Sequence, residues 1–266
     1  MRLSVVIITW NGLAYLKACL ESLVPTFDFD CDEIVVVDNA SSDGTVPWLK
    51  DTYPQIRLLQ NDQNMGVAPA RNKGMWYSKG DYIMILDNDT RYLSQKNLGE
   101  VISGYFKDHE DVGLFAFRLR NPDGTLQDNV RRFPDVFQPF VARLGFLRKI
   151  GFLDKSYHAH LMHDVALEEV TSSLDVDYVL GANQVFRREI AVHLKGYDDF
   201  IFYGPEDCDF CLRVHRLGYK VQYVPAVEIC HEYQRNTRGF GMRTLKHAFY
   251  FYYFFFKNRA FFKIKI

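Results

Sequence analysis

Four short apolar segments, separated by stretches with helical spacing, occupy the first ninety residues of the chain. Uninterrupted apolar runs of this length are typical of strands that are buried on both faces. Strands that alternate with helices predict an α/β fold with a mostly parallel central sheet flanked by helices. The predicted strands are Leu3–Ile8, Glu33–Val37, Ile56–Leu59 and Tyr82–Leu86, and the predicted helices between them cover residues 12–24, 43–53 and 68–78.

The second half of the chain has a less regular pattern. We expect a helix at Leu98–Lys107, a strand at Val112–Leu119 and a long, partly helical insertion over residues 131–173 that faces a variable ligand. At 266 residues, with 48% apolar and 24% charged residues, the chain fits one large globular domain or one domain with an appendage. Further strands are expected at Asp177–Phe186, Lys220–Val224 and Val227–Cys230.

The C-terminal segment differs from the rest in charge and composition. Eight basic and no acidic residues follow Glu232, so this segment carries +8, whereas the first 232 residues carry −9. Residues Phe249–Phe256 are eight consecutive aromatics, a run too short to span a bilayer. Aromatic residues mixed with Lys and Arg fit the membrane interface, so we expect a peripheral membrane contact through residues 243–266. The alternative is a helix that packs on the domain or on a second subunit.

The number and spacing of the cysteines, together with the N-terminal sequence, indicate the cellular compartment that we expect for the protein. The five cysteines are scattered and odd in number, and the chain enters its first strand almost at once, so we expect neither a disulfide framework nor a signal peptide. We therefore expect a cytoplasmic protein, peripheral at the inner face of the cell membrane. We expect no nucleic-acid partner, and the oligomeric state stays open.

The strand predicted at Tyr82–Leu86 ends in Asp87-Asn88-Asp89. Alternation along an extended backbone places the side chains of Asp87 and Asp89 on the same side. Two carboxylates at the carboxyl end of a strand suit a divalent cation such as Mg²⁺ or Mn²⁺, with substrate phosphates as further ligands. Two other interpretations stay open: an Asx turn after a strand, and the nucleophile motif of a haloacid-dehalogenase-type phosphatase.

Polar residues follow the other predicted strands as well. Thr9 and Asn11 follow the first strand, Asp38 and Asn39 end the second, and Arg71 lies in the helix after the third. The carboxyl ends of parallel strands meet at one crevice. Since the chain has neither a dinucleotide fingerprint nor a P-loop, phosphates would have to be neutralised by a cation and by Arg71. Asp38 could accept a hydrogen bond from a pyrimidine N–H group, or could only form a turn.

An acidic pair marks the start of a later predicted helix. Pro205 followed by Glu206 and Asp207 is typical of a first helical turn. The partial positive charge of a helix N-terminus favours the ionised form of Asp207, which would keep it a base at neutral pH. The alternative is that both acids only cap the helix. His231 follows the last predicted strand and is either structural or a metal ligand that favours Mn²⁺ over Mg²⁺.

These segments together resemble the family 2 glycosyltransferases, which have the nucleotide-diphosphosugar (GT-A) fold. The resemblance runs in order from residue 3 to about 233, and the ordered set is far more specific than any one motif. Within the family, the chain is most similar to bacterial rhamnosyltransferase-like enzymes that build surface polysaccharides. The segments that carry the resemblance are Ser4–Asn11, Val36–Thr45, Asn64–Gly66, Ala70–Asn72, Asp87–Asp89, Gly181–Asn183, Arg187–Glu189, Gly196–Asp198 and Gly204–Asp209.

The resemblance implies roles on the donor side. Thr9 and Asp38 would hold the nucleobase. Arg71 would lie near the base and the diphosphate, and Asp87 would contact the ribose or the sugar. The other residues of this nucleotide-sugar site would be Asn11, Asn39 and Asn88.

The resemblance also implies the metal and catalytic residues. Asp89 would bind Mg²⁺ or Mn²⁺ directly, and His231 occupies the place where some relatives contribute a histidine to the metal. Asp207 resembles the catalytic base of the family, and Glu206 would contact the acceptor sugar. One base and one displacement imply inversion at the anomeric carbon.

The implied function is that of an inverting glycosyltransferase with a dTDP-rhamnose or UDP-sugar donor. The acceptor would be a glycan or a polyprenyl-diphosphate-linked sugar in surface polysaccharide synthesis. Two alternatives remain: the phosphatase named above, and a catalytically inactive nucleotide-sugar-binding protein. The implied division is a GT-A domain over residues 1–232, with a nucleotide-binding half at 1–95 and an acceptor and catalytic half at 96–232, followed by a basic aromatic tail at 233–266 that we expect to be helical.

Overall fold

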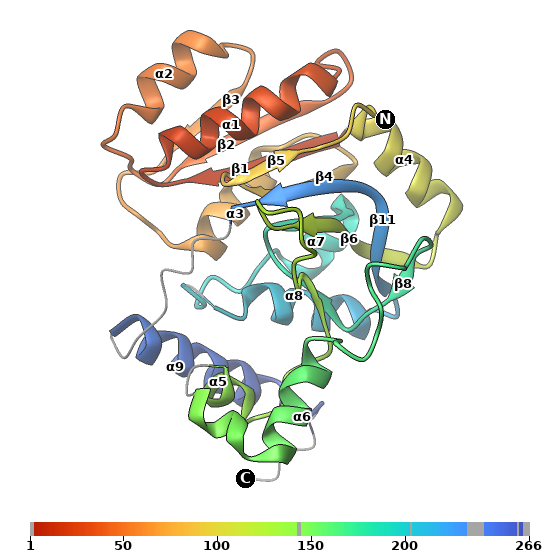
Figure 1. Ribbon diagram of the computed structural model, residues 1–266. Coiled ribbons are helices and arrows are strands. Elements are labelled where there is room, and N and C mark those ends of the chain that lie inside the picture. The colour runs from red at the N-terminus through yellow and green to blue at the C-terminus, as the bar shows by residue number, and fades with distance from the viewer. Residues whose placement is uncertain (1–2, 143–144, 203, 233–241, 260, 263–266) are drawn as a thin grey trace.

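A computed structural model describes residues 3–142, 145–202, 204–232, 242–259 and 261–262. A nine-stranded sheet forms the centre of the molecule (Figure 1). Its order is β3-β2-β1-β4-β10-β6-β11-β5, with β8 beside β11. The strands are β1 (Leu3–Thr9), β2 (Glu33–Asp38), β3 (Arg57–Gln60), β4 (Tyr82–Asp87), β5 (Thr90–Tyr92), β6 (Val112–Arg120), β8 (Leu174–Asp175), β10 (Asn183–Arg187) and β11 (Lys220–His231).

The first four predicted strands form a parallel group within this sheet, as expected. β2 and β4 each pair with β1 in parallel, and β3 pairs with β2 in parallel. The register places Thr9 opposite Asp38 and Ile8 opposite Asp87. The polar residues that end these strands therefore lie at one edge of the sheet.

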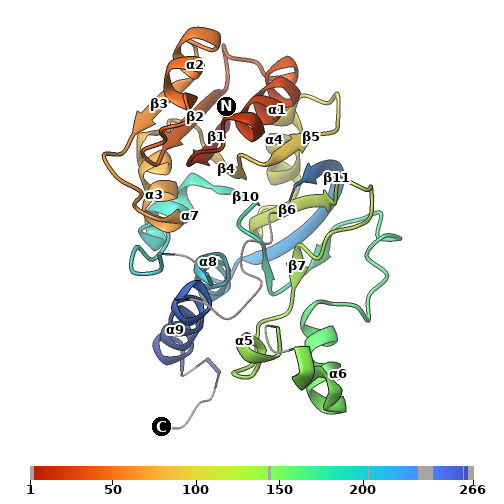
Figure 2. The ribbon, with the colours of Figure 1, turned by 60° about the vertical axis from the view of Figure 1, so that its left-hand side comes forward.

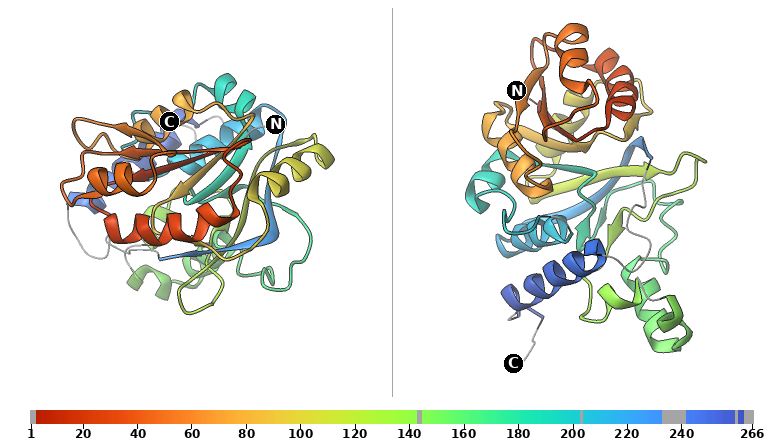
Figure 3. Two further views of the ribbon diagram at one scale, coloured as in Figure 1. Left: turned by 90° about the horizontal axis from the view of Figure 1, so that it is seen from above. Right: turned by 90° about the vertical axis from the view of Figure 1, so that its left-hand side faces the viewer.

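Helices cover both faces of the sheet, which explains the uninterrupted apolar strands. Along β1, Val5 and Ile7 face one hydrophobic cluster and Val6 faces the other. Both clusters are fully buried because each face has its own helical layer (Figure 3). One layer contains α1 (Leu13–Leu23), α2 (Thr45–Thr52) and α4 (Leu98–Asp108). The other layer contains α3 (Val67–Tyr77), α7 (Arg188–Leu194) and α8 (Glu206–Arg216). A 3₁₀ turn, η1 (Val24–Thr26), follows α1.

The second half departs from the predicted strands in two places. The strand predicted at Asp177–Phe186, which contains a Gly-Ala break, divides at that break into two strands: β9 (Tyr178–Val179) pairs with β7 (Val130–Arg131) in a separate two-stranded sheet, and β10 joins the main sheet. The two strands predicted over residues 220–230 are one strand, β11, whose register against β6 shifts between Val224 and Glu228. β5 was not predicted, because it pairs only with the distant end of β11.

The insertion is partly helical, as predicted. It contains α5 (Gln138–Val141), η2 (Gly145–Lys149) and α6 (Gly151–His160). These helices lie at one end of the molecule, beside the C-terminal helix (Figure 1).

The aromatic tail forms α9 (Met242–Lys257), which packs against the domain beside α8 (Figure 2). Phe254 and Phe255 are buried in the same cluster as the apolar side chains of α8. Lys257 Nζ forms ion pairs with Asp198 at 2.7 Å and Asp209 at 2.9 Å. Tail residues 233–241, 260 and 263–266 lie outside the described residues. Within the described part of the chain, no helix has the length and apolar character needed to cross a membrane.

Candidate active site

Three side chains of types that bind metal ions converge at the carboxyl edge of the sheet. Asp87 ends β4, Asp89 follows it, and His231 ends β11, which is brought beside them by pairing with β5. Their ligand atoms lie within 4.8 Å of one another. Two carboxylates and one imidazole form a donor set that fits Mg²⁺ or Mn²⁺, so the residues predicted to hold a cation are together.

The His231 ring is buried and directed at this cluster. Its Nε2 lies 3.3 Å from Asp89 Oδ1, and its Nδ1 lies 2.6 Å from Gln127 Oε1. Burial lowers the pKa of His231, but the Asp89 carboxylate raises it by more, so the pKa lies above its ordinary value. Gln127 could not be predicted from the sequence, because nothing near it in sequence marks its contact with His231, 104 positions away.

Arg71 joins Asp87, at the end of β4, to the acidic pair of α8. Its guanidinium donates to Asp87 Oδ1 at 2.9 Å and to Glu206 Oε1 at 3.1 Å, and its side chain is 3% exposed. Burial alone would lower the pKa of Arg71, but the two carboxylates outweigh it and raise the pKa above its ordinary value. Arg71 is thus a charged bridge inside the protein rather than an exposed cation.

Gly181 allows this bridge to pass close to the backbone. A Cβ at Gly181 would lie 2.3 Å from Nη1 of Arg71, so a side chain there would displace the guanidinium. The Gly181 N–H donates to Asp207 Oδ2 at 3.0 Å. The glycine of the predicted Gly181–Asn183 segment therefore positions both Arg71 and the expected base.

The acidic pair lies in the first turn of α8, as predicted. Burial raises the pKa of Asp207, although the Gly181 N–H and Arg71 oppose the shift. Burial and the adjacent Asp207 likewise raise the pKa of Glu206 against the effect of Arg71. The net pKa shift is therefore opposite to the one expected from the helix N-terminus, because the loss of solvent outweighs the N–H donors and Arg71.

Glu206 is engaged within the protein. One carboxylate oxygen accepts from Arg71, and the other accepts from the Gly204 N–H at 2.9 Å. Glu206 is 6% exposed. Its contacts are those of a residue that holds Arg71 and the loop before α8, while its predicted contact with the acceptor sugar stays a prediction.

The residues predicted to hold the nucleobase lie at the ends of β1 and β2. Asp38 is 1% exposed, and its Oδ2 accepts from Ser41 N at 3.0 Å. Its Oδ1 is buried and has no hydrogen-bond partner among the described residues. Thr9 Oγ1 accepts from Asn88 Nδ2 at 3.0 Å. An unpartnered buried acceptor suits a ligand that brings an N–H donor.

Asn11 and Asn39 hold the loops around this edge. Asn39 Oδ1 accepts from Asn61 Nδ2 at 2.7 Å, and Asn39 Nδ2 donates to the Gly66 carbonyl oxygen at 3.0 Å. Asn11 Oδ1 accepts from Ser42 N at 2.8 Å. Both residues lie where a nucleotide sugar is expected, but these amide groups bind the protein's own loops.

The family model described as Glycosyl transferase family 2 matches residues 4–171. The chain belongs to glycosyltransferase family 2. This confirms the resemblance, and the Asp-x-Asp after the fourth strand is that of a glycosyltransferase rather than the phosphatase nucleophile motif.

Curated relatives of this family 2 glycosyltransferase come from several bacteria. This chain is 24% identical over 251 residues to the N-acetylglucosaminyl-diphospho-decaprenol L-rhamnosyltransferase of Mycobacterium tuberculosis, and the match covers 88% of this chain and 77% of that protein. It is 26% identical over 254 residues to the uncharacterized glycosyltransferase YfnE of Bacillus subtilis, covering 82% of this chain and 61% of that protein. It spans 25% of the uncharacterized protein y4gI of Sinorhizobium fredii, with 24% identity over 242 residues and 89% of this chain covered.

Solved structures show the same fold. GalNAc-T7 with UDP, GalNAc and Mn²⁺ matches with a TM-score of 0.66 at 17% identity, over 94% of this chain and 47% of that chain. The mannosyltransferase PcManGT of Pyrobaculum calidifontis, with GDP-Man and Mn²⁺, matches with a TM-score of 0.60 at 20% identity, over 89% of this chain and 58% of that chain. The predicted GT-A fold is confirmed.

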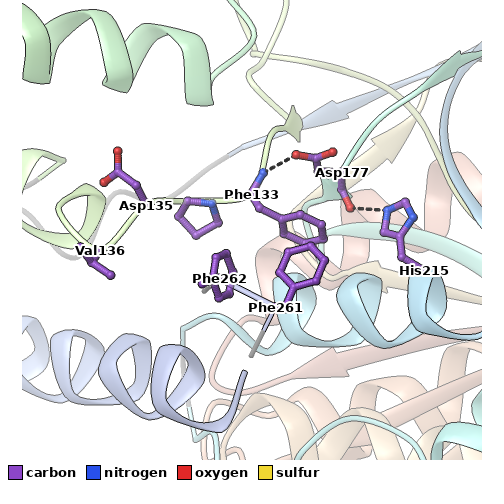
Figure 4. A pocket seen from close by; sticks show the side chains of 8 residues that line it. Phe133, Asp135, Val136, Asp177, His215, Phe261 and Phe262 are labelled. Atoms are coloured by element: carbon purple, nitrogen blue, oxygen red, sulfur yellow. Dashed lines mark hydrogen bonds between the residues drawn. The ribbon is translucent and has the colours of Figure 1, made fainter. Parts of the chain in front are cut away.

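A separate apolar cavity of about 670 Å³ lies between the insertion, α8 and the side chains of Phe261 and Phe262 (Figure 4). Asp177 forms part of its wall, where its Oδ2 accepts from Phe133 N at 2.7 Å and its carbonyl oxygen lies 2.9 Å from His215 Nε2. None of the site residues of the glycosyltransferase lines it. The lining residues are Phe133, Pro134, Asp135, Val136, Asp177, His215, Phe261 and Phe262.

Proposed function

We propose that the protein is an inverting, metal-dependent glycosyltransferase with Asp207 as its catalytic base. The observation that carries the proposal is the Arg71 bridge. A single buried guanidinium links Asp87, on the metal side, to Glu206, the neighbour of Asp207. The donor site and the base are therefore held in one rigid arrangement.

The nucleobase would bind at the ends of β1 and β2. Asp38 Oδ1, which has no partner among the described residues, would accept the imide N–H of a pyrimidine. Thr9 would contact the same base from the neighbouring strand. Recognition of this kind favours a thymidine or uridine nucleotide, whose base carries such an N–H group.

Asp89, His231 and Asp87 would hold the divalent cation. When bound, the cation would stabilise the negative charge that develops on the departing nucleoside diphosphate. Both terminal nitrogens of Arg71 already bind carboxylates, so its contribution would be to hold Asp87 and Glu206 in position. A direct contact between Arg71 and the diphosphate stays a prediction.

Asp207 would remove the proton from the acceptor hydroxyl. As that oxygen bonds to the anomeric carbon, the bond from this carbon to the diphosphate oxygen breaks, and its electron pair leaves with the nucleoside diphosphate. The raised pKa of Asp207 brings it closer to neutral pH, where a carboxylate is a more effective general base. A single displacement inverts the anomeric configuration.

The donor and acceptor are proposed from the relatives. The name of the mycobacterial relative specifies a rhamnosyltransferase and an acceptor on diphospho-decaprenol, which supports dTDP-rhamnose and a polyprenyl-diphosphate-linked sugar. A UDP-sugar is the second candidate, since TarS of S. aureus, with the same fold at 14% identity and a TM-score of 0.57, is described with UDP-GlcNAc. Surface polysaccharide synthesis is the pathway that fits both donor candidates.

A lipid-linked acceptor would be reached from the membrane through α9. The inner side of this helix buries Phe254 and Phe255, while Phe249, Tyr252 and Phe256 are 57%, 42% and 58% exposed. Three exposed aromatics at helical spacing, on a segment rich in Lys and Arg, fit the interface of an anionic membrane. Because α9 is part of the core, deleting it would damage the fold, and point changes on its outer side test membrane contact better.

The central experiment screens nucleotide sugars with Mn²⁺ for thermal shift and for donor hydrolysis or transfer, in the wild type and in Asp207→Asn. We expect Asp207→Asn to bind the donor normally and to lose transfer by at least about 100-fold. Asp209→Asn is the control, because Asp209 is a buried acid of the same helix that binds Arg213 and Lys257 instead. It should lower stability but keep the turnover of the folded protein. Unchanged transfer in Asp207→Asn would reject the base, and donor binding without turnover in the wild type would support an inactive binding protein.

A membrane test uses anionic vesicles. The double change Phe249→Ser with Phe256→Ser should lower binding to these vesicles, while Tyr77→Ser, an aromatic 56% exposed on α3, should not. Equal vesicle binding by the two variants would reject the α9 contact without affecting the assignment of the base.

A further inference from the structure

The histidine of the metal cluster is held by a buried glutamine that lies outside every sequence motif. Gln127 Oε1 is 2.6 Å from His231 Nδ1, and Gln127 is 8% exposed. The two residues are 104 positions apart. They meet because β6 pairs with β11, and the chain after β6 turns back along it, with Gln127 N donating to the Leu119 carbonyl oxygen at 3.0 Å.

Hydrogen bonds determine which end of the Gln127 amide faces the imidazole. Its Nε2 donates to the main-chain oxygen of His231 at 3.4 Å and to Asn121 Oδ1 at 2.9 Å. A main-chain oxygen can only accept a hydrogen bond, so the amide nitrogen must lie on that side. The oxygen of the Gln127 side chain is therefore the atom presented to His231 Nδ1.

The Asn121 amide is oriented in the same way. Its Nδ2 donates to the main-chain oxygen of Leu126 at 3.4 Å and to Thr125 Oγ1 at 3.0 Å. Thr125 Oγ1 gives its one hydrogen to Asp123 Oδ1 at 2.6 Å, so it can only accept from Asn121. The hydrogen bonds that lead to Gln127 therefore have a fixed direction, because they end on Asp123 and on main-chain oxygens, which can only accept.

This direction has a consequence for the imidazole. An acceptor at Gln127 requires the hydrogen on Nδ1 of His231, and Nε2 is the nitrogen that faces Asp89. Metal-binding histidines have this arrangement, with the second ring nitrogen donating to a fixed acceptor. A neutral amide sets the tautomer without adding a third carboxylate beside Asp87 and Asp89.

We propose that Gln127 is a positioning residue of the cation site. It holds the His231 ring in the tautomer and orientation in which Nε2 binds Mn²⁺. The inference rests on the proposed metal dependence, but it concerns the binding of the ion rather than sugar transfer.

The test compares Gln127→Met and Gln127→Glu in the full chain. Glu keeps an oxygen that can accept from Nδ1, whereas the Met thioether is a weak acceptor of similar length. We expect the affinity for Mn²⁺, measured by electron paramagnetic resonance titration, to fall about 10–100-fold in Gln127→Met and to be retained in Gln127→Glu. Nitrogen-15 NMR of the Mg²⁺-loaded chain, in which the cation takes the place of a proton on Nε2, should show Nδ1–H in the wild type and a population with Nε2–H in Gln127→Met; His231→Asn gives the assignment.

Gln222→Met is the matched control. Gln222 is 6% exposed, and its amide donates to Asp175 Oδ1 at 2.6 Å rather than binding a residue of the metal cluster. It should lower the thermal midpoint and leave the Mn²⁺ affinity unchanged. Wild-type affinity and tautomer in Gln127→Met would overturn the proposal, as would an equal loss of affinity in Gln222→Met. Mn²⁺ binding that depends on Gln127, in a chain that transfers no sugar, would reject only the proposed function, whereas a wild type that binds no Mn²⁺ would overturn both.

Discussion

Arg71 and Glu206 form a buried ion pair of 3.1 Å across 135 positions of sequence. The same guanidinium reaches Asp87 at 2.9 Å. One side chain of α3 therefore aligns the end of β4 with the first turn of α8. Because the pair is shielded from water, removing Arg71 leaves Glu206 buried without a counter-charge, and this makes the bridge a sensitive test of the site.

Arg71→Met should lower the free energy of unfolding by about 3–5 kcal/mol, because it leaves Glu206 buried without a counter-charge and removes the ion pair of the partly exposed Asp87. Combining Arg71→Met with Glu206→Gln should recover part of this loss, since the second change removes one of the unpaired carboxylates. Urea denaturation measures both. A double variant no more stable than the single variant would show that the Arg71–Glu206 pair is not a main source of the effect.

Gly181→Ala should displace Arg71, because the new Cβ would lie 2.3 Å from Nη1. We expect overpacking to cost about 1–3 kcal/mol of unfolding free energy, together with a fall in kcat. Gly104→Ala is the matched change, since Gly104 lies inside α4 with no atom within 4 Å of its added Cβ. It should raise stability by up to about 1 kcal/mol and leave kcat unchanged. The same loss of kcat in both variants would show that Gly181 does not affect kcat by positioning Arg71.

Asp89→Asn should weaken Mn²⁺ binding by more than the roughly 10–100-fold typical of losing an outer partner of a metal ligand. Treatment of the wild type with a chelator should abolish sugar transfer, and added Mn²⁺ should restore it. Asp62→Asn, which also removes one carboxylate but from an exposed position, is the control. Calorimetric titration of the chelated chain measures the affinity, and transfer that persists with no cation would argue for a metal-independent enzyme.

His160 should make the protein less stable in mild acid. Burial lowers the pKa of His160 to about 3, while an unfolded histidine titrates near about 6.5. The neutral ring therefore contributes stability above about pH 6.5, and this contribution is lost as pH falls toward 3. At about pH 5 the expected loss is about 2 kcal/mol.

Urea unfolding across this pH range measures the effect in the wild type and in His160→Gln. The variant should lack this part of the pH dependence. His158→Gln, which replaces a histidine whose side chain is 46% exposed, should retain it. An identical pH dependence in all three chains would show that His160 ionises as easily in the folded protein as in the unfolded one.

The N-terminal half of the fold could be predicted from the sequence for a physical reason. A strand buried on both faces has few polar residues, so β1, β2 and β4 appear as apolar runs whose polar ends share one edge of a parallel sheet. Thr9, Asp38 and Asp87 therefore meet at that edge, as the strand order alone requires. The family resemblance added the roles of these residues.

The second half depended on contacts that local patterns do not encode. β10 enters the sheet antiparallel between β4 and β6, and β5 pairs with the end of β11 to bring His231 beside Asp89. The raised pKa of Asp207 likewise comes from burial, which depends on everything packed around the start of α8.

The sequence by itself determined the buried strands, the acidic residues at their ends and the aromatic tail helix, because these follow from periodicity and from local residue chemistry. Only the tertiary structure decided which charges face each other: Arg71 between Asp87 and Glu206, and Gln127 against His231. It also buried one side of α9 on the domain and left another exposed. The reason is that strand order and helix packing bring together residues more than a hundred positions apart, and local sequence patterns do not predict such contacts.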